Sequence, residues 1–245
     1  MTSSNSDKTS KKLIPARNSN QLTTLVLVLP ILIIYDVGVL FTDVMNGADF
    51  FTQTLLRWTG VKGFIGIQAG LLVIWIGLAI YFRQKQVLNR RLFLPVLAES
   101  SIYALTMGTF IVFIMVDLLQ LQPHLSVAQQ LGNTRLFDRI ILSLGAGFHE
   151  ELVFRLFLQS AIIQVGDRML NLRKWIAILF GFVGSAFLFS LAHHVGPLGE
   201  PLNLGVFVYR LIAGIFFGIL YQFRSFPVAV YTHALYDIYI LVLRG

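Results

Sequence analysis

Two adjacent glutamates, a histidine and an arginine interrupt the apolar segment FHEELVFRLF. They are His149, Glu150, Glu151 and Arg155. The residues on either side are mostly leucine, isoleucine and alanine, which is typical of a membrane-spanning helix. A charged side chain near the centre of a bilayer costs at least ~2.5 kcal/mol. We therefore expect these acids to have a function that offsets this cost.

The two glutamates are predicted to have different environments on a helix. Glu151 and Arg155 stand four residues apart with the acid first, which is the favourable order for an ion pair along one helix face. Glu150 points about 100° away around the helix and has no such partner in the local sequence. A carboxylate in a poorly solvated site is a suitable general base. We expect Glu150 to do chemistry and Glu151 with Arg155 to support it.

Two later segments supply further polar groups inside apolar stretches. The segment FLFSLAHHVG places His193 and His194 at the end of an apolar helix, and YTHALYDIYI places His233 four residues before Asp237 on one helix face. A carboxylate and two histidines from different helices are able to activate water against an amide carbonyl and to stabilise the resulting oxyanion. The same set allows an alternative, a zinc ion with one position left for water. No cofactor is required by these residues, and metal ligation stays open.

The composition defines the setting of this chemistry. Of the 245 residues, 56% are hydrophobic and 13% are charged, and the mean hydropathy is +0.74. Soluble domains carry about 25% charged residues, so a multi-pass membrane protein is indicated. The net charge of +7 suits an anionic lipid surface better than nucleic acid. Cysteine is absent, which excludes disulfides, thiolate metal sites and a cysteine nucleophile.

The predicted fold is an all-α membrane helix bundle of about seven to eight transmembrane helices over residues 23–245. Residues 1–22 are polar and basic and are predicted to form a disordered tail. Apolar runs long enough to cross a bilayer lie near residues 23–43, 63–82, 100–121, 138–165, 175–195, 204–222 and 226–243. These boundaries place His193 and His233 at depths that differ by more than roughly 10 Å. Both are expected to meet Glu150, so tilted helices of unequal length must absorb this mismatch.

The distribution of lysine and arginine predicts the orientation. The tail and the alternate loops on its side carry twelve of these residues, against five on the other side. This asymmetry favours a cytoplasmic N-terminus in the cell membrane.

Three short motifs resemble one known family. They are EELVFR from Glu150 to Arg155, FSLAH from Phe189 to His193, and HALYD from His233 to Asp237. Their order and types resemble the EExxxR, FxxxH and HxxxN/D motifs of the CPBP family, which includes type II CAAX prenyl endopeptidases and abortive-infection-like bacteriocin-processing proteins. The resemblance covers about residues 138–239.

The resemblance implies a glutamate-dependent intramembrane endopeptidase. Its catalytic residues would be Glu150 as general base, His193 and His233 binding water and the oxyanion, and Asp237 where the family often has asparagine. An ionised aspartate cannot donate a hydrogen bond, so Asp237 is expected to orient His233 or a water. The implied partners are the lipid bilayer and a peptide, prenylated or membrane-protein substrate.

Other classes of protein are less well supported. The zinc-protease motif HExxH begins at His149 but has Val153 in place of its second histidine. The chain also lacks the GxGD motif of presenilin-like proteases. The alternatives that remain are a proton-coupled membrane transporter and a non-catalytic immunity or scaffold protein.

Overall fold

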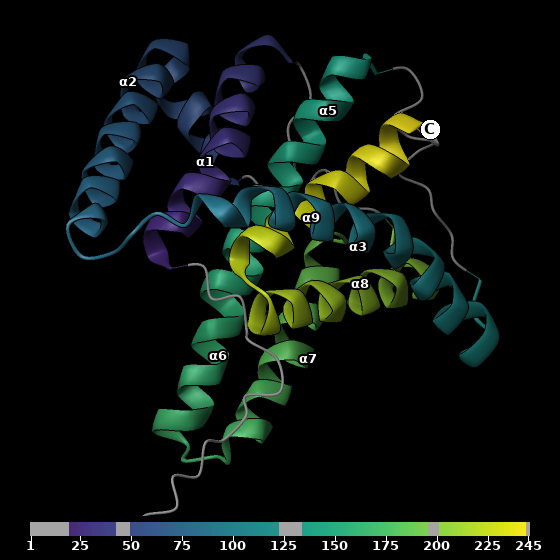
Figure 1. The fold of residues 1–245 in the computed structure, drawn as a ribbon. Helices are drawn as coiled ribbons and strands as arrows, with labels where there is room; N and C mark the ends of the chain where they lie inside the picture. The colour runs from purple at the N-terminus through teal and green to yellow at the C-terminus, as the bar shows by residue number, and fades with distance from the viewer. Residues whose placement is uncertain (1–19, 43–49, 123–133, 196–200, 244–245) are drawn as a thin grey trace, which may run out of the picture.

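The structure, a computed structural model, describes residues 20–42, 50–122, 134–195 and 201–243. All regular secondary structure in these ranges is helical (Figure 1), so the predicted all-α class is confirmed. The predicted tail lies outside the described residues up to residue 19. Its last two residues, Gln21 and Leu22, already belong to the first helix.

The helices vary in length and several continue into short segments of different winding. The α-helices are α1 (Gln21–Gly38), α2 (Phe50–Arg83), α3 (Phe93–Phe113), α5 (Leu136–Gly145), α6 (Ser160–Gln164), α7 (Lys174–Ala192), α8 (Leu204–Phe223) and α9 (Phe226–Ile238). The 3-10 segments are η1 (Val39–Phe41) and η2 (Arg90–Leu92), and the π-helical segments are η3 (Ile114–Leu118), η4 (Ala146–Glu150), η5 (Leu152–Gln159), η6 (Val165–Met169) and η7 (Tyr239–Leu243).

Six helices in the described residues are long and apolar enough to cross a membrane. They correspond to six of the seven predicted spans. The remaining predicted span, 138–165, is the fourth along the chain. It lies in the helix that continues from Leu136 to Met169 through α5, η4, η5, α6 and η6. Its ion-pairing residues make it too polar to qualify by composition, which is the feature that made it a candidate site.

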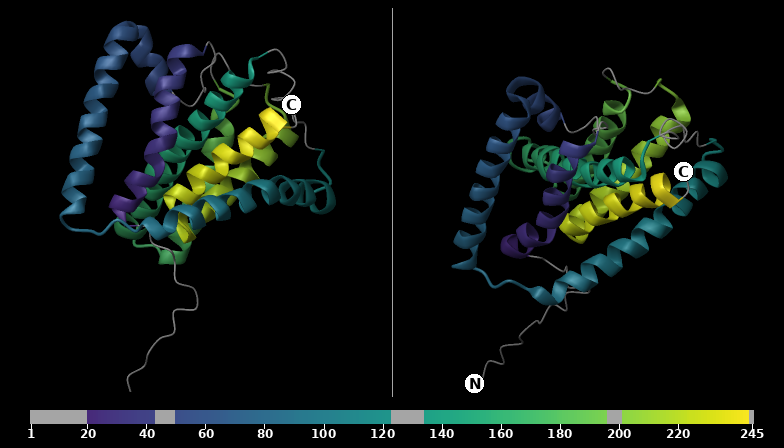
Figure 2. Two further views of the ribbon diagram at one scale, coloured as in Figure 1. Left: turned by 45° about the horizontal axis from the view of Figure 1, so that its top comes forward. Right: turned by 90° about the horizontal axis from the view of Figure 1, so that it is seen from above.

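The second span begins earlier than predicted. α2 starts at Phe50 and contains one non-helical residue, Gly60, with φ 65°. That positive φ is a conformation glycine adopts without a steric penalty, so the chain changes direction there before the apolar part of the helix. α2 lies at the edge of the bundle beside α1, separate from the other helices (Figure 2).

Helix α9 lies at the centre of the bundle. It contacts α1, α3, α5, α8 and η4, and Val228, Ala229 and Val230 on it are almost fully buried. The side chain of Ser225 accepts a hydrogen bond from the Val228 amide and caps the first turn of α9. This position brings His233 and Asp237 of α9 next to the helix Leu136–Met169, which contains Glu150, Glu151 and Arg155 and is called the charged helix.

Candidate active site

The charged helix approaches α9 most closely at Gly147, in η4. A Cβ atom built on Gly147 would lie 2.6 Å from the Cβ of Ala234 and 2.7 Å from its backbone nitrogen. Only a residue without a side chain allows this separation. The close approach brings Glu150 and Glu151 within reach of His233, which directly precedes Ala234.

The glutamates lie where the charged helix widens into π turns. Glu150 ends η4, and Glu151 stands between η4 and η5. Single π turns inside α-helices frequently occur at functional sites. Glu150 is 4% exposed and Glu151 is fully buried, so both carboxylates are removed from bulk solvent in a part of the chain that is otherwise apolar.

Two histidines converge on one oxygen of Glu150. The Nε2 atoms of His193 and of His233 each lie 3.7 Å from Oε2 of Glu150. This separation is too long for a direct hydrogen bond, and a bridging water is the usual intermediary at such a distance. Both histidines therefore reach Glu150, as expected if tilted helices absorb the offset in depth, and the helix axes are inclined to one another (Figure 1).

The position of each imidazole is determined by its other nitrogen. His193 follows the last residue of α7, and its Nδ1 lies 2.8 Å from the carbonyl oxygen of Phe189. His233 places Nδ1 2.8 Å from Oε1 of Glu151. Carbonyl and carboxylate oxygens are acceptors, so both Nδ1 atoms carry the hydrogen and both Nε2 atoms face Glu150.

Asp237 completes this group from the next turn of α9. Its Oδ2 atom lies 3.7 Å from Nε2 of His233, and it is thus on the same side of the ring as Glu150. Phe217 of α8 stacks on the other surface of His233, with ring centroids 4.3 Å apart and planes inclined by 14°. The imidazole is therefore held at its edge by Glu151 and on its face by Phe217.

Arg155 and Glu151 form the predicted ion pair. Nε of Arg155 lies 3.3 Å from Oε2 of Glu151, and both side chains are fully buried. The guanidinium also donates to Oγ of Ser185 on α7, and its Cζ atom lies 4.8 Å from the centre of the Phe189 ring. Glu151 thus links Arg155 to His233, which is a supporting arrangement like the one expected from the sequence.

Two other histidines near the motifs, His149 and His194, contact different groups. His149 directs Nδ1 at the carbonyl oxygen of Gly145 at 3.2 Å and lies against the ring of Tyr35. His194 stacks on Phe207. His193 and His233 are thus the histidines whose Nε2 atoms lie 3.7 Å from Oε2 of Glu150.

Two contributors were not identified from the sequence. Ser185 accepts a hydrogen bond from the Arg155 guanidinium, and Phe217 stacks on His233. A lone serine and one phenylalanine in apolar helices carry no distinguishing pattern. Their roles depend on how α7 and α8 pack against the site.

A family comparison agrees with the motifs. Residues 132–239 match the family model described as type II CAAX prenyl endopeptidase Rce1-like. This region of the chain is Rce1-like. Comparison with curated proteins and with solved structures gives no match. The matched residues are under half of the chain and contain every candidate catalytic residue. Together with the six apolar helices of the described residues, the match to the membrane-protease family model supports an integral, multi-pass membrane protein.

The histidine and carboxylate groups around Glu150 are of the types that bind zinc. Histidine nitrogens and carboxylate oxygens are ordinary zinc ligands, which bind at about 2.0–2.2 Å. Within the described ranges, no group of three or more histidine, aspartate or glutamate residues has an arrangement that would hold a metal ion. The described side chains as placed do not form a zinc site.

Proposed function

We propose that the protein hydrolyses a peptide bond of a membrane-associated substrate with a water molecule activated by Glu150. The observation that carries this proposal is the convergence of His193 Nε2 and His233 Nε2 on Oε2 of Glu150 at 3.7 Å each. The Rce1-like region supports a peptide or prenylated protein as substrate.

The water would lie between Glu150 and His193. Because Nδ1 of His193 donates to Phe189, the neutral ring offers Nε2 as an acceptor for one hydrogen of that water. Glu150 removes the other proton as the oxygen attacks the carbonyl carbon of the substrate. The same carboxyl group then returns the proton to the leaving amine, so that its protonation state is restored.

His233 and Asp237 would act on the substrate carbonyl oxygen. Acceptors face both nitrogens of His233, with Glu151 at Nδ1 and Asp237 on the side of Nε2. A doubly protonated imidazolium satisfies this arrangement and donates to the oxyanion from Nε2. In this mechanism Asp237 positions His233 and does not touch the reacting atoms.

The test uses purified full-length protein in lipid nanodiscs with a farnesylated CAAX-type peptide and an otherwise identical peptide without the lipid. We expect cleavage by the wild type and none by Glu150→Gln with an unchanged melting temperature. Proton flux in proteoliposomes, without cleavage of either peptide, would instead support the transporter alternative. We also propose the cell membrane and a cytoplasmic N-terminus, which reporter fusions at both ends would test.

A further inference from the structure

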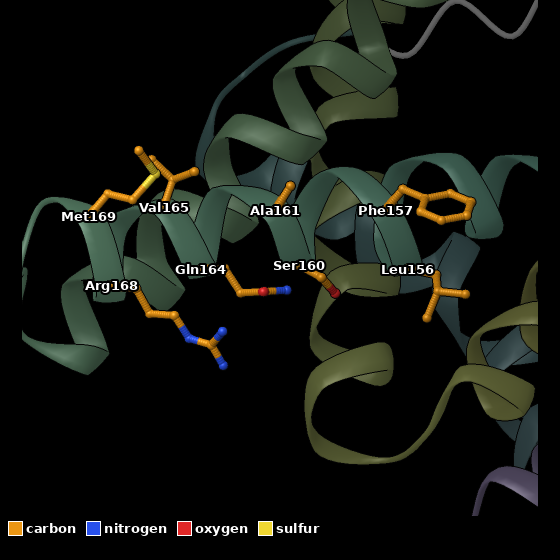
Figure 3. Close-up of a pocket in the computed structure, with 8 residues that line it drawn as sticks. All are labelled: Leu156, Phe157, Ser160, Ala161, Gln164, Val165, Arg168 and Met169. Carbon is orange, nitrogen blue, oxygen red and sulfur yellow. The ribbon is translucent and has the colours of Figure 1, made fainter.

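A groove on the outer side of the charged helix lies apart from the active site. It has a volume of about 470 Å³ and is lined by residues of η5, α6 and η6. One row of side chains contains Ser160, Gln164 and Arg168, and a second row contains Phe157, Ala161 and Val165. Figure 3 shows the two rows projecting to opposite sides of the helix.

The rows are straight because the helix changes its winding. Residues four apart overshoot one turn of an α-helix, which has about 3.6 residues per turn. They fall short of one turn in a π-helix, whose hydrogen bonds join residues five apart. In this helix the π segments η5 and η6 flank the α-helical segment α6, so the two deviations cancel. The result is a continuous polar row beside a continuous apolar row.

The polar row ends at a cluster of positive charge. Arg168 lies in the last turn of η6, close to the turn that connects to α7, where Arg173 and Lys174 follow. Asp167 also lies there. Three cations and one anion leave a net charge of +2 at this end. Basic clusters at this depth attract the phosphates of anionic lipids.

The opposite end of the groove lies near α8. The hydroxyl of Ser160 lies 2.8 Å from that of Tyr221, which places the end of α8 along the polar row. Ala161 is the smallest side chain in the apolar row and gives the groove its depth, whereas Phe157 is 63% exposed at its end.

The length of the groove is close to the thickness of one lipid leaflet. Phe157 and Arg168 are eleven residues apart, which corresponds to at most about 16 Å, the length of an α-helix of that many residues. One leaflet of the hydrocarbon core is about 15 Å thick. The cationic end of the groove matches the phosphate of a phospholipid at the membrane boundary. The apolar row, about as long as one leaflet, matches an extended acyl chain.

We propose that this groove binds one anionic phospholipid, with its phosphate on Arg168 and an acyl chain along Val165, Ala161 and Phe157. The lipid would belong to the leaflet that contains the turn between η6 and α7. This site is independent of the chemistry at Glu150, so its test does not depend on peptide cleavage.

The test is native mass spectrometry of the full-length protein released from nanodiscs that contain equal amounts of phosphatidylglycerol and phosphatidylcholine. We expect the wild type to retain one phosphatidylglycerol in preference to phosphatidylcholine. Arg168→Gln should bind it about fivefold more weakly, the effect of one cation near a lipid surface. Ala161→Trp fills the groove and should lose the bound lipid.

Two matched variants control for surface charge and for bulk. Arg91→Gln removes an exposed arginine of η2, and Ala98→Trp enlarges an exposed alanine of α3. Both should retain the lipid as the wild type does. Equal retention by the wild type, Arg168→Gln and Ala161→Trp would overturn the proposal. So would photolabelling of the groove by a farnesylated peptide that displaces the lipid, because the groove would then bind substrate.

Discussion

Glu151 and His233 are joined at 2.8 Å between Oε1 and Nδ1, although they are 82 positions apart in the chain. The other oxygen of Glu151 faces Arg155 at 3.3 Å. One buried carboxylate therefore connects a fixed cation to the imidazole that lies beside Glu150. This arrangement distinguishes the two adjacent glutamates, since one contacts the supporting groups and the other faces the space between the histidines.

The first prediction concerns Glu150→Gln. The amide keeps the size of the side chain but cannot accept a proton, so cleavage should fall roughly 100- to 10,000-fold, the usual contribution of a general base. The melting temperature in detergent should stay close to that of the wild type. A fluorogenic peptide assay beside a thermal melt measures both. Wild-type cleavage by this variant would exclude Glu150 as the base.

The second prediction concerns Glu151→Gln, which should lower both stability and activity. The change leaves Arg155 as a fully buried cation without its anion, and breaking a buried pair costs about 3–5 kcal/mol. Arg155→Ala should behave similarly because it leaves Glu151 uncompensated. Thermal melts of the two variants should shift together, while Glu150→Gln serves as the control. A Glu151→Gln variant with unchanged melting and activity would contradict the role given to this pair.

The sequence predicted the helices and the Glu151–Arg155 pair because both depend on local spacing. Apolar runs define spans, and positions four apart share a face. The contact of His233 with Glu151 was not predicted, because it depends on the approach of η4 to α9 at Gly147. The stacking of Phe217 on His233 was not predicted either, because it depends on how α8 packs against α9. The roughly 10 Å offset in depth between His193 and His233 applies to parallel, upright helices, and the expected tilt of the helices removes it.

The third prediction tests that close approach with Gly147→Ala. Alanine favours a helix by about 1 kcal/mol over glycine, so an unhindered position would gain stability. Here the added methyl would meet Ala234 at 2.6 Å, and overpacking of this kind costs about 1–3 kcal/mol. The variant should melt at a lower temperature and cleave more slowly, because Glu150 moves away from His233.

Gly66→Ala is the matched control for this change. Gly66 is in α2, and a Cβ built there has no neighbour within 4 Å. The Gly66→Ala variant should cleave at the wild-type rate, and its melting temperature should be equal to or higher than that of the wild type. Equal behaviour of the two alanine variants would show that η4 and α9 tolerate a wider separation than the structure has.

The fourth prediction concerns metal dependence. If Glu150 is the base, it is not also a zinc ligand, so treatment with a chelator should leave most of the cleavage activity. Elemental analysis of the active, chelator-treated protein should show zinc well below one equivalent. Stoichiometric zinc whose removal stops turnover and whose return restores it would reassign Glu150, His193 and His233 as ligands.

The last prediction separates the possible roles of Asp237, which lies 3.7 Å from Nε2 of His233. If Asp237 positions the ring or a water by accepting a hydrogen bond, the carbonyl oxygen of asparagine should serve nearly as well. Asp237→Asn should then keep much of the wild-type kcat, and Asp237→Leu, which has a similar size but no acceptor, should lose nearly all of it. KM should change little in either variant, because Asp237 acts through His233 and not on the substrate. Steady-state kinetics of the two variants, with thermal melts to exclude unfolding, give the comparison. A folded Asp237→Leu variant with wild-type kcat would reduce Asp237 to a packing residue of α9.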